Sequence, residues 1–470
     1  MKILFINPPI KYSLSPLPPL GIAYVAAVLR QNSYENIRIV DGASQFLSVD
    51  AIVEQAIAFG PDIIGITVMS NVKSVATTLT NILKQKLPSP LVCWGGAHAT
   101  ALPEHCFKNS SVDVVFRHES EFSFLEFVRR VEAHKDFTDI KGLCYKKDGT
   151  VHCNEKVARI TALDSLPLPA RDLLPMDKYS TVSWFGSKVK KATTIISSRG
   201  CPYECTYCAN KVCWGDRKYI HRDPVKVVDE METLVREYGV GGFQFSDECL
   251  TANRKNATAF CEELLKRKLN VSWVCSSSVK NVDVELLRLM KRAGCEFINY
   301  GIESGSPEIR KILKKNITNE DIFTAVAAAK KSGLRVGCCF LLGCPGETPA
   351  TARETISMAR KLAPDEVSFN IVVPFPGTEI YELLVAPKNL DLDWDEAMGF
   401  DPLNPDTPKV FFNCSQIPDR ELISLYREAR RKVELNIFAF RMIYNRLIHV
   451  SSPRHLFVVI KGGLSLLFKR

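Results

Sequence analysis

Residues 193–210 read TTIISSRGCPYECTYCAN and join a strand-like apolar run to a loop that holds three cysteines. These are Cys201, Cys205 and Cys208. Their spacing, C-x3-C-x2-C, is typical of a soft metal or an iron–sulfur cluster. A structural zinc site would want a fourth ligand, and the nearest candidates, Cys213 and His221, do not form a recognisable second pair. The loop therefore predicts a cluster with three protein ligands and one open iron, and a zinc module is the alternative.

The strand before this loop opens a series of six strand-like segments that runs to about residue 375. They are TTIISS, GFQFSDE, VSWVCSS, FINYGIES, VGCCFLLG and VSFNIVV, with helical segments between them. Six strands are too few for an eight-fold barrel and suffice for a partial (β/α)6 barrel that is open at one side. Polar and glycine-rich segments follow these strands. Because such barrels carry their catalytic groups at the strand C-termini, we expect the active site at that end.

The first 130 residues also alternate strand and helix signals, from KILFIN to the helix ESEFSFLEFVRRV. Such alternation predicts an α/β fold with a doubly wound parallel sheet. GLCYKKDGTVHC follows as a hairpin with Asp148-Gly149 in a tight turn, and the proline-rich LDSLPLPARDLLPM is typical of a linker. The predicted domains are 1–140 (doubly wound sheet), 141–188 (hairpin and linker), 189–385 (partial barrel) and 386–470 (helical, basic C-terminal extension).

The chain has 470 residues, 16 cysteines and a formal net charge of +9. It shows neither a signal-peptide pattern nor an apolar run of membrane-spanning length, so we expect a cytoplasmic protein with reduced thiols. All cysteines except the three of the loop are expected to be small core residues.

The charge excess is concentrated near the C-terminus, where residues 435–470 hold six basic side chains and no acidic one. The rest of the chain is close to neutral, which argues against a nucleic-acid binder. Two interpretations of this tail remain. It is either a helical pair packed on the open side of the barrel, or a segment in peripheral contact with the anionic inner surface of the membrane.

The cysteine loop resembles the cluster motif of the radical S-adenosylmethionine (SAM) superfamily, and the expected partial barrel is the fold of that superfamily. The resemblance implies a [4Fe-4S] cluster on Cys201, Cys205 and Cys208, whose open iron chelates the amino and carboxylate groups of SAM. It also implies an external electron donor of the flavodoxin or ferredoxin type. Reductive cleavage of SAM would then give a 5′-deoxyadenosyl radical that abstracts hydrogen from the substrate.

Other positions match places where this superfamily contacts SAM. Tyr207 corresponds to an aromatic residue that borders the adenine. Asp247 and Glu248, in FSDECLT, stand where an acidic motif receives the ammonium group. Here Ser-Asp-Glu replaces the usual two glycines and glutamate, so the choice between the two carboxylates is open. A solvated loop end is the alternative for both.

Three further segments match ribose, methionine and adenine contacts of the superfamily. Ser276 or Ser278 and Glu303 correspond to the ribose and methionine contacts, and Gly343, in GCPGE, to the glycine-containing segment near the adenine. For Glu303 the alternative is a role at a helix N-terminus, because Ser-Pro-Glu follows at 306–308.

The N-terminal domain resembles the cobalamin-binding module of cobalamin-dependent radical SAM enzymes, through PPLGIAYVAAVLR, GITVMS and WGGAHAT. The resemblance implies that the Thr67 hydroxyl hydrogen-bonds the buried dimethylbenzimidazole tail, and that Gly95 and Gly96 admit the nucleotide loop. NPPIKYSLSPLPPLG lacks the cobalt-binding histidine of another cobalamin group, so no protein histidine is expected on cobalt. His98 is expected at the surface or against the tail.

The implied function is methyl transfer to an unactivated carbon of a small-molecule or lipid-like substrate. One SAM would methylate the cobalamin and a second would supply the radical. A cobalamin-dependent radical cyclase or rearrangement enzyme, of the magnesium-protoporphyrin monomethyl ester cyclase type, uses the same cofactors and is the alternative. A non-catalytic redox or cobalamin-binding sensor would need an output domain, and the sequence shows none.

Overall fold

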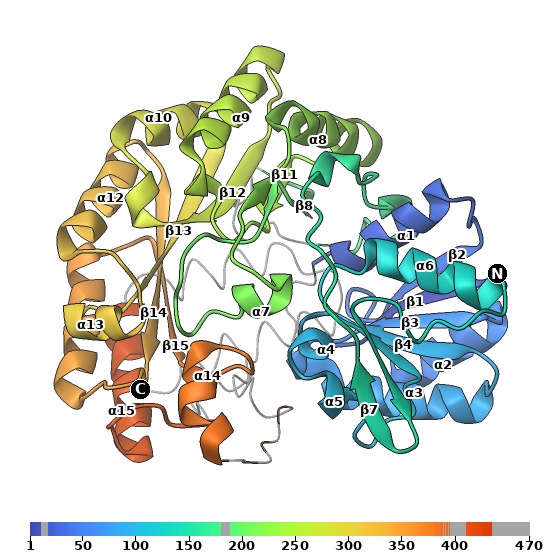
Figure 1. The fold of residues 1–470 in the computed structure, drawn as a ribbon. Helices are drawn as coiled ribbons and strands as arrows, with labels where there is room; N and C mark the ends of the chain where they lie inside the picture. The colour runs from blue at the N-terminus through green and yellow to red at the C-terminus, as the bar shows by residue number, and fades with distance from the viewer. Residues whose placement is uncertain are drawn as a thin grey trace. The chain divides into compact units, whose positions relative to one another are not determined.

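The computed structural model describes residues 1–10, 17–179, 189–388 and 410–434, together with residues 390, 392 and 394. The chain folds as two compact units (Figure 1). The described residues of unit 1 are 1–10, 17–179, 209–216, 392 and 394, and those of unit 2 are 189–208, 217–388, 390 and 410–434.

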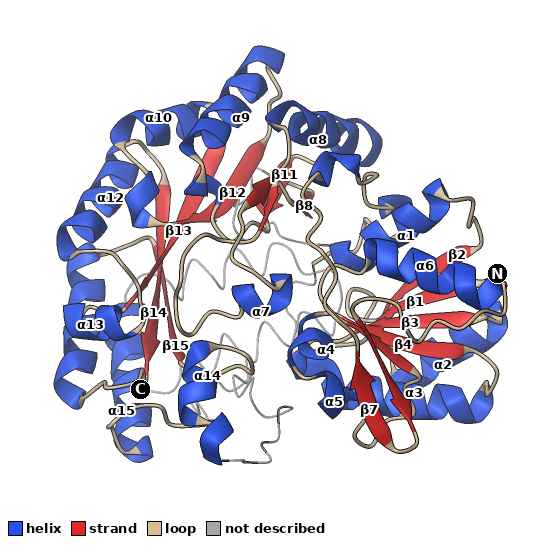
Figure 2. Ribbon diagram, viewed as in Figure 1, coloured by secondary structure: helices blue, strands red, loops and turns tan. Residues whose placement is uncertain are grey.

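Unit 1 is built on one seven-stranded sheet, with strand order β2-β1-β3-β4-β5-β6-β7 (Figure 2). Its strands are β1 (Ile3–Asn7), β2 (Ile37–Asp41), β3 (Ile63–Thr67), β4 (Leu91–Gly95), β5 (Val114–Phe116), β6 (Leu143–Lys147) and β7 (Thr150–Cys153). The first five are parallel, because each is joined to the next by a helical crossover. The strand order reverses between β1 and β3, the place where such sheets bind ligands at the strand C-termini.

Helices cover both faces of this sheet (Figure 2), as a parallel sheet requires. The helices of unit 1 are α1 (Leu20–Gln31), α2 (Val49–Phe59), α3 (Lys73–Lys86), α4 (Ala97–Ala101), α5 (Pro103–Cys106), α6 (Glu121–Glu132) and α7 (Asn210–Trp214). Helix α7 packs near α4, although it comes from a later part of the chain. The described helices include none that is long and apolar enough to cross a membrane.

The hairpin of β6 and β7 holds the disulfide between Cys144 and Cys153. The two residues are directly paired across the hairpin, with their Cα atoms 4.1 Å apart. The expectation that every cysteine outside the loop is a reduced core residue is therefore wrong here, and Cys153 is exposed. Both cysteines lie at equal distance from the turn at Asp148-Gly149, and this symmetry brings them face to face.

Unit 2 is built on a six-stranded sheet in the order β15-β14-β13-β12-β11-β8, and all its pairs are parallel. The strands are β8 (Ala192–Ile195), β11 (Gly242–Phe245), β12 (Ser272–Ser277), β13 (Cys295–Glu303), β14 (Arg335–Leu342) and β15 (Glu366–Ile371). Strands β8 and β15 are the two edges, so the prediction of a partial barrel is confirmed. A two-stranded ribbon of β9 (Ser198–Arg199) and β10 (Ile220–His221) follows β8.

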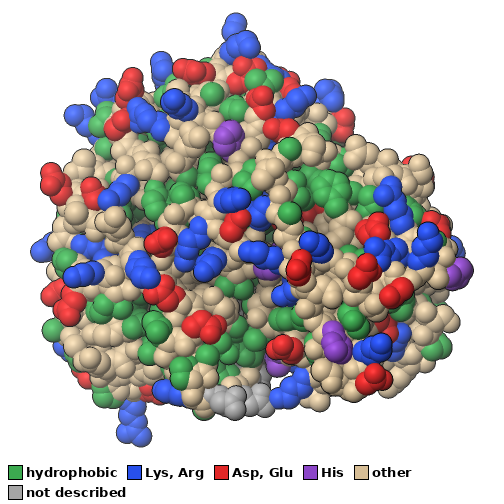
Figure 3. Space-filling model, viewed as in Figure 1, with side chains coloured by type: hydrophobic (Ala, Val, Ile, Leu, Met, Phe, Trp, Pro, Cys, Tyr) green, Lys and Arg blue, Asp and Glu red, His purple; other side chains and the backbone are tan. Residues whose placement is uncertain are grey.

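The long helices between the strands line the outer side of this sheet (Figure 2). The helices of unit 2 are α8 (Pro224–Tyr238), α9 (Arg254–Arg267), α10 (Val284–Arg292), α11 (Pro307–Ile312), α12 (Asn319–Lys331), α13 (Pro349–Leu362), α14 (Glu379–Leu384) and, near the C-terminus, α15 (Asp419–Ala429). Local sequence fixes where they begin: capping boxes at Thr318 and Thr348 start α12 and α13. On the face drawn in Figure 3, the region of α8, α9, α10 and α12 presents acidic and basic side chains interspersed.

Candidate active site

The cysteine loop follows β8 and β9 at the end of the sheet where the parallel strands finish. Cys205 is buried, Cys201 and Cys208 are half-buried, and none of the three is in a disulfide. The pKa of Cys201 is raised to about 12, mainly by burial and further by the nearby thiols of Cys249, Cys208 and Cys205, although a backbone hydrogen bond at Tyr203 lowers it. These sulfur atoms are thus close electrostatic neighbours.

The three thiols suit a four-iron cluster better than a single metal ion. Within the described ranges, no three His, Cys, Asp or Glu side chains converge as they would on a single metal ion. A four-iron cluster does not require such convergence, because each cysteine binds a different iron. Three neighbouring cysteines on one loop, none of them in a disulfide, therefore fit the group, and their role as ligands stays a prediction.

Backbone hydrogen bonds fix the cysteine loop to the neighbouring elements. The Thr206 amide donates to the Leu313 carbonyl (3.1 Å), and the Ile380 amide donates to the Thr206 carbonyl (3.2 Å). The Asn281 side chain donates to the Tyr203 hydroxyl (2.6 Å). The loop is therefore held in place by segments that follow β12, β13 and β15, without any bound group.

A buried cluster of Tyr207, Glu303 and Lys315 lies beside the cysteines. The Glu303 carboxylate accepts a hydrogen bond from the Tyr207 hydroxyl, and its Oε1 lies 3.3 Å from the Lys315 Nζ. Burial lowers the pKa of Lys315, but Glu303 and Cys205 outweigh it and leave the pKa raised, so the ammonium stays charged. Burial and the charges of Glu303 and Cys205 raise the pKa of Tyr207.

The backbone around Glu303 is adapted to this cluster. Glu303 has a φ of 69°, a left-handed conformation that is unfavourable for a residue with a side chain. A Cβ atom at Gly301 would lie 2.4 Å from the Glu303 Oε1 and 3.1 Å from the Lys315 Nζ. Gly301 thus leaves the room in which the carboxylate and the ammonium meet. Sequence reasoning missed Lys315, because nothing in the sequence distinguishes it from the exposed Lys314 beside it.

The two candidate carboxylates after β11 have different surroundings. Asp247 is buried, and it accepts hydrogen bonds from the Ser197 amide (3.0 Å), the Ser197 hydroxyl (2.6 Å) and the Ser198 hydroxyl. Burial raises its pKa to about 6, although the bonds from Ser197 and Ser198 lower it. Glu248 is exposed. Asp247 therefore anchors the segment that leads into the cysteine loop.

The two candidate serines also differ. Ser278 is buried, and its hydroxyl accepts a hydrogen bond from the Lys280 amide (3.4 Å), which caps a short helical turn. Ser276 is half-buried near the end of β12, between the buried Cys275 and Ser277. The alternation of a strand places Ser276 on the face opposite to its two neighbours. Of the two hydroxyls, only that of Ser278 has a structural role in the described contacts.

The GCPGE segment after β14 is a turn held by its own glutamate. The Glu347 carboxylate accepts hydrogen bonds from the amides of Gly343 and Cys344, and burial raises its pKa to about 7. Gly343 has a φ of 78°, and a Cβ atom there would lie 3.0 Å from Leu422. Backbone conformation therefore explains the glycine, and an adenine contact stays a prediction.

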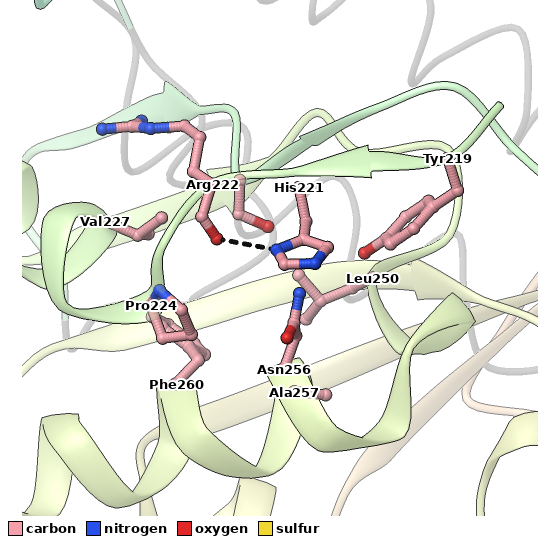
Figure 4. A pocket seen from close by; sticks show the side chains of 10 residues that line it. Tyr219, His221, Arg222, Pro224, Val227, Leu250, Asn256, Ala257 and Phe260 are labelled. Carbon is pink, nitrogen blue, oxygen red and sulfur yellow. Dashed lines mark hydrogen bonds between the residues drawn. The ribbon is translucent and has the colours of Figure 1, made fainter. Parts of the chain in front are cut away.

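Figure 4 shows a small cavity next to the Asp247 anchor, where the side chains of Tyr219, His221, Leu250 and Asn256 face one another. Its volume is about 20 Å³, enough for about one water molecule and far too small for a nucleoside. The cofactor site is therefore not in this cavity.

In unit 1, the predicted cobalamin contacts gather at the C-terminal ends of β3 and β4. Gly96 has a φ of 106°, and a Cβ atom there would lie 2.9 Å from the Val68 carbonyl and 3.2 Å from the Thr67 hydroxyl. Thr67 and Gly95 end their strands side by side in the sheet. Thr67, Gly95 and Gly96 are thus brought together at the ends of β3 and β4, one strand away from the reversal between β1 and β3.

His98 is not at the surface, which corrects one of the two expectations for it. It is 1% exposed, and its ring nitrogens lie 3.1 Å from the Ser70 hydroxyl and 3.1 Å from His105 Nδ1. Burial, with the charges of His105 and Lys73, lowers its pKa to about 3. His98 is therefore a neutral residue whose two nitrogens are both engaged inside unit 1.

Two family models match the chain. The radical SAM superfamily matches residues 195–359, and the B12 binding domain matches residues 10–128. An uncharacterized methyltransferase of Pyrococcus horikoshii is 34% identical over 86% of this chain and 87% of its own length. The anaerobic magnesium-protoporphyrin IX monomethyl ester cyclase of Rubrivivax gelatinosus is 31% identical over 82% of this chain and 70% of its own length.

The fold is also that of a solved structure. The radical SAM methyltransferase TsrM from Kitasatospora setae, with cobalamin and a [4Fe-4S] cluster bound, matches 98% of this chain and 99% of its own with a TM-score of 0.74 and 16% sequence identity.

Proposed function

Since the chain belongs to the cobalamin-dependent radical SAM enzymes, we propose that it is a methyltransferase that acts on an unactivated carbon of a small-molecule or lipid-like substrate. The observation that carries the proposal is the set of three neighbouring cysteines at the strand ends of a partial barrel, in one chain with a B12-type sheet. When bound, the cluster supplies the electron that cleaves SAM and the cobalamin carries the methyl group.

Cys201, Cys205 and Cys208 would hold the cluster. We assign the ammonium group of SAM to Glu248, because the Asp247 carboxylate is occupied by Ser197 and Ser198. Lys315 would attract the carboxylate of SAM, since its ammonium is charged and adjoins Cys205.

The remaining predicted contacts are assigned by position. Ser276 would contact the ribose, and Tyr207 and Gly343 would border the adenine. In unit 1, Thr67, Gly95 and Gly96 would hold the tail and nucleotide loop of cobalamin. We also propose that the domains of the chain meet at residues 140, 188 and 385.

The cyclase is the second candidate, because a relative of that name is 31% identical. The two functions differ in the fate of the methyl group. Protein loaded with cluster and cobalamin is mixed with reductant and SAM without any substrate. A methyltransferase moves the methyl group to its cobalamin, so S-adenosylhomocysteine should form in an amount equal to the bound cobalamin. Formation of 5′-deoxyadenosine without S-adenosylhomocysteine would favour the cyclase.

The contact of residues 435–470 with an anionic membrane is also a proposal, and this tail lies outside the described residues. Each basic side chain near an anionic surface contributes about 1 kcal/mol of attraction. Full-length protein should therefore sediment with anionic vesicles at low salt, and a chain that ends near Asn436 should not. Equal sedimentation of the two would rule out the contact and, with it, access to a lipid substrate through the tail.

A further inference from the structure

Lys73 is a buried lysine of unit 1 to which the proposed function gives no role. It is 8% exposed, and its ammonium group has no carboxylate or hydrogen-bond partner within the described residues. Buried charges are normally paired, because the transfer of a charge out of water is costly. The Lys73 nitrogen is not itself enclosed, so an anion can reach it. A ligand can therefore supply the missing partner.

The Lys73 ammonium is directed to the edge of the sheet where β3 and β4 end. Lys73 is the first residue of α3, which follows β3, and it lies on the buried side of that helix with Ala76 and Thr80. Side chains on a helix tilt toward its N-terminus, so the Lys73 side chain extends past the start of α3. Thr67 and Gly95 lie at the same edge.

The charge of Lys73 acts on two residues that follow β4, His98 in α4 and Cys106 in α5. Burial and the charge of His105 lower the pKa of His98 to about 3, and the charge of Lys73 adds to this effect. Burial raises the pKa of the Cys106 thiol to about 12, although the charge of Lys73 lowers it. Because His98 is neutral, Lys73 and not His98 supplies positive charge at this edge.

The N-terminus of α3 adds to this positive charge. Helix α3 has 14 residues and begins without a capping side chain and without an acidic residue in its first turn. The amides of a helix N-terminus that lack such partners carry a partial positive charge. A helix N-terminus next to an unpaired ammonium group is suited to bind a phosphate group.

One group of cobalamin matches this site. The side chains around the corrin ring are neutral amides, and the phosphodiester of the nucleotide loop is the anion among the peripheral groups. We propose that Lys73 and the N-terminus of α3 bind this phosphodiester, and that unit 1 thereby selects complete cobalamin over corrinoids that lack the phosphate. The proposal rests on the proposed function, which assigns the nucleotide loop to the neighbouring Thr67, Gly95 and Gly96.

The test measures the dissociation constants of three corrinoids by equilibrium dialysis against the full-length protein. Hydroxocobalamin carries the phosphodiester and the lower base, cobinamide phosphate carries a phosphate without the base, and cobinamide carries neither. Lys73→Met removes the charge and keeps the length of the side chain, and Lys73→Arg keeps the charge. Lys86→Met is the matched control, because Lys86 is exposed at the opposite end of the same helix.

We expect Lys73→Met to bind hydroxocobalamin and cobinamide phosphate about tenfold more weakly than wild type, because a charge-assisted hydrogen bond is lost. Its affinity for cobinamide should be unchanged. Lys73→Arg should keep most of the affinity for all three corrinoids, and Lys86→Met should match wild type. Without corrinoid, the melting temperature of Lys73→Met should be no lower than that of wild type, because the substitution removes an unpaired buried charge.

The failures are distinguishable. If Lys73→Met binds hydroxocobalamin as wild type does, or loses affinity for cobinamide to the same extent, Lys73 does not bind the phosphodiester. A loss of affinity for hydroxocobalamin but not for cobinamide phosphate would assign Lys73 to the base or its ribose and would also overturn the proposal. In each of these cases wild type still binds cobalamin, and the proposed function stands. If wild type binds none of the three corrinoids, the proposed function itself fails.

Discussion

Asp247 and Glu248 are adjacent in the sequence, but the first is buried and the second is exposed, so their roles differ. From the sequence they are equal candidates for the ammonium of SAM. In the fold, the Asp247 carboxylate accepts three hydrogen bonds from Ser197 and Ser198, while Glu248 is exposed. Which of two adjacent side chains is buried after a strand depends on the face to which each points and on the segments packed against that face. The sequence of two adjacent acidic residues does not show this.

Burial of Asp247 predicts a pH-dependent loss of stability. Its pKa is about 6 in the folded chain against an ordinary value of 3.8. The contribution is therefore most favourable below pH 4 and is lost as pH rises to 6, by roughly 3 kcal/mol in total. Asp247→Asn removes the charge and keeps one acceptor oxygen for the hydroxyls of Ser197 and Ser198, but it loses the hydrogen bond from the Ser197 amide. The melting temperature of the variant minus that of wild type should increase from pH 4 to pH 6 and then level off. A difference independent of pH would contradict the assigned pKa.

The assignment of three cysteines to the cluster predicts that each of them is essential for SAM cleavage. Changing Cys201, Cys205 or Cys208 to Ala should abolish 5′-deoxyadenosine formation under dithionite, since a cluster with two protein ligands is not retained. Cobalamin binding should persist, because these thiols are outside the described parts of unit 1. Changing Cys213, which lies outside the C-x3-C-x2-C motif, to Ala should leave the cluster intact and serves as the control. Cleavage of SAM by a variant in which all three cysteines are changed to Ala would rule out the cluster assignment.

At the scale of elements, the sequence was sufficient for the six strands of the barrel and insufficient for short elements such as α7 and the β9–β10 ribbon, and for the side chains between the elements. Apolar runs predicted all six strands, because this pattern follows from local burial. Contacts between segments that are apart in the sequence determine the role of Lys315 and the left-handed backbone of Glu303. The Cys144–Cys153 disulfide depends on a contact across a turn. The equal spacing of the two cysteines from Asp148-Gly149 indicates that they are paired across the hairpin, which an argument from composition alone does not show.

Gly301, near the end of β13, gives a test at this scale. In Gly301→Ala the new methyl group would displace the ends of the Glu303 and Lys315 side chains, which can move. We therefore expect a melting temperature close to wild type and affinity for SAM about tenfold weaker, measured by equilibrium dialysis. Gly21→Ala, where a Cβ atom meets nothing within 4 Å, is the matched control. A large loss of stability with unchanged affinity would place the glycine in packing alone.

At the scale of the whole molecule, unit 1 should bind cobalamin without a protein histidine on cobalt. His98 is the histidine nearest to the predicted tail site in sequence, and both its ring nitrogens are engaged by Ser70 and His105. Electron paramagnetic resonance of the cob(II)alamin form should therefore show no nitrogen superhyperfine splitting. A clear triplet would contradict the prediction, and loss of that triplet in His98→Ala would identify the ligand.

The path of the chain through its two units affects how the protein is made. Helix α7 belongs to unit 1 but directly follows Cys208, so the N-terminal unit is not complete at residue 179. Domains commonly fold in order as they leave the ribosome. Here the last helix of unit 1 can dock only after residue 216 has left the ribosome. The cysteine loop precedes that helix in the sequence, so it has emerged by then. A ribosome-bound chain stalled just after residue 179 would therefore hold an incomplete domain, and protection of unit 1 from proteases should increase once residues 209–216 are exposed.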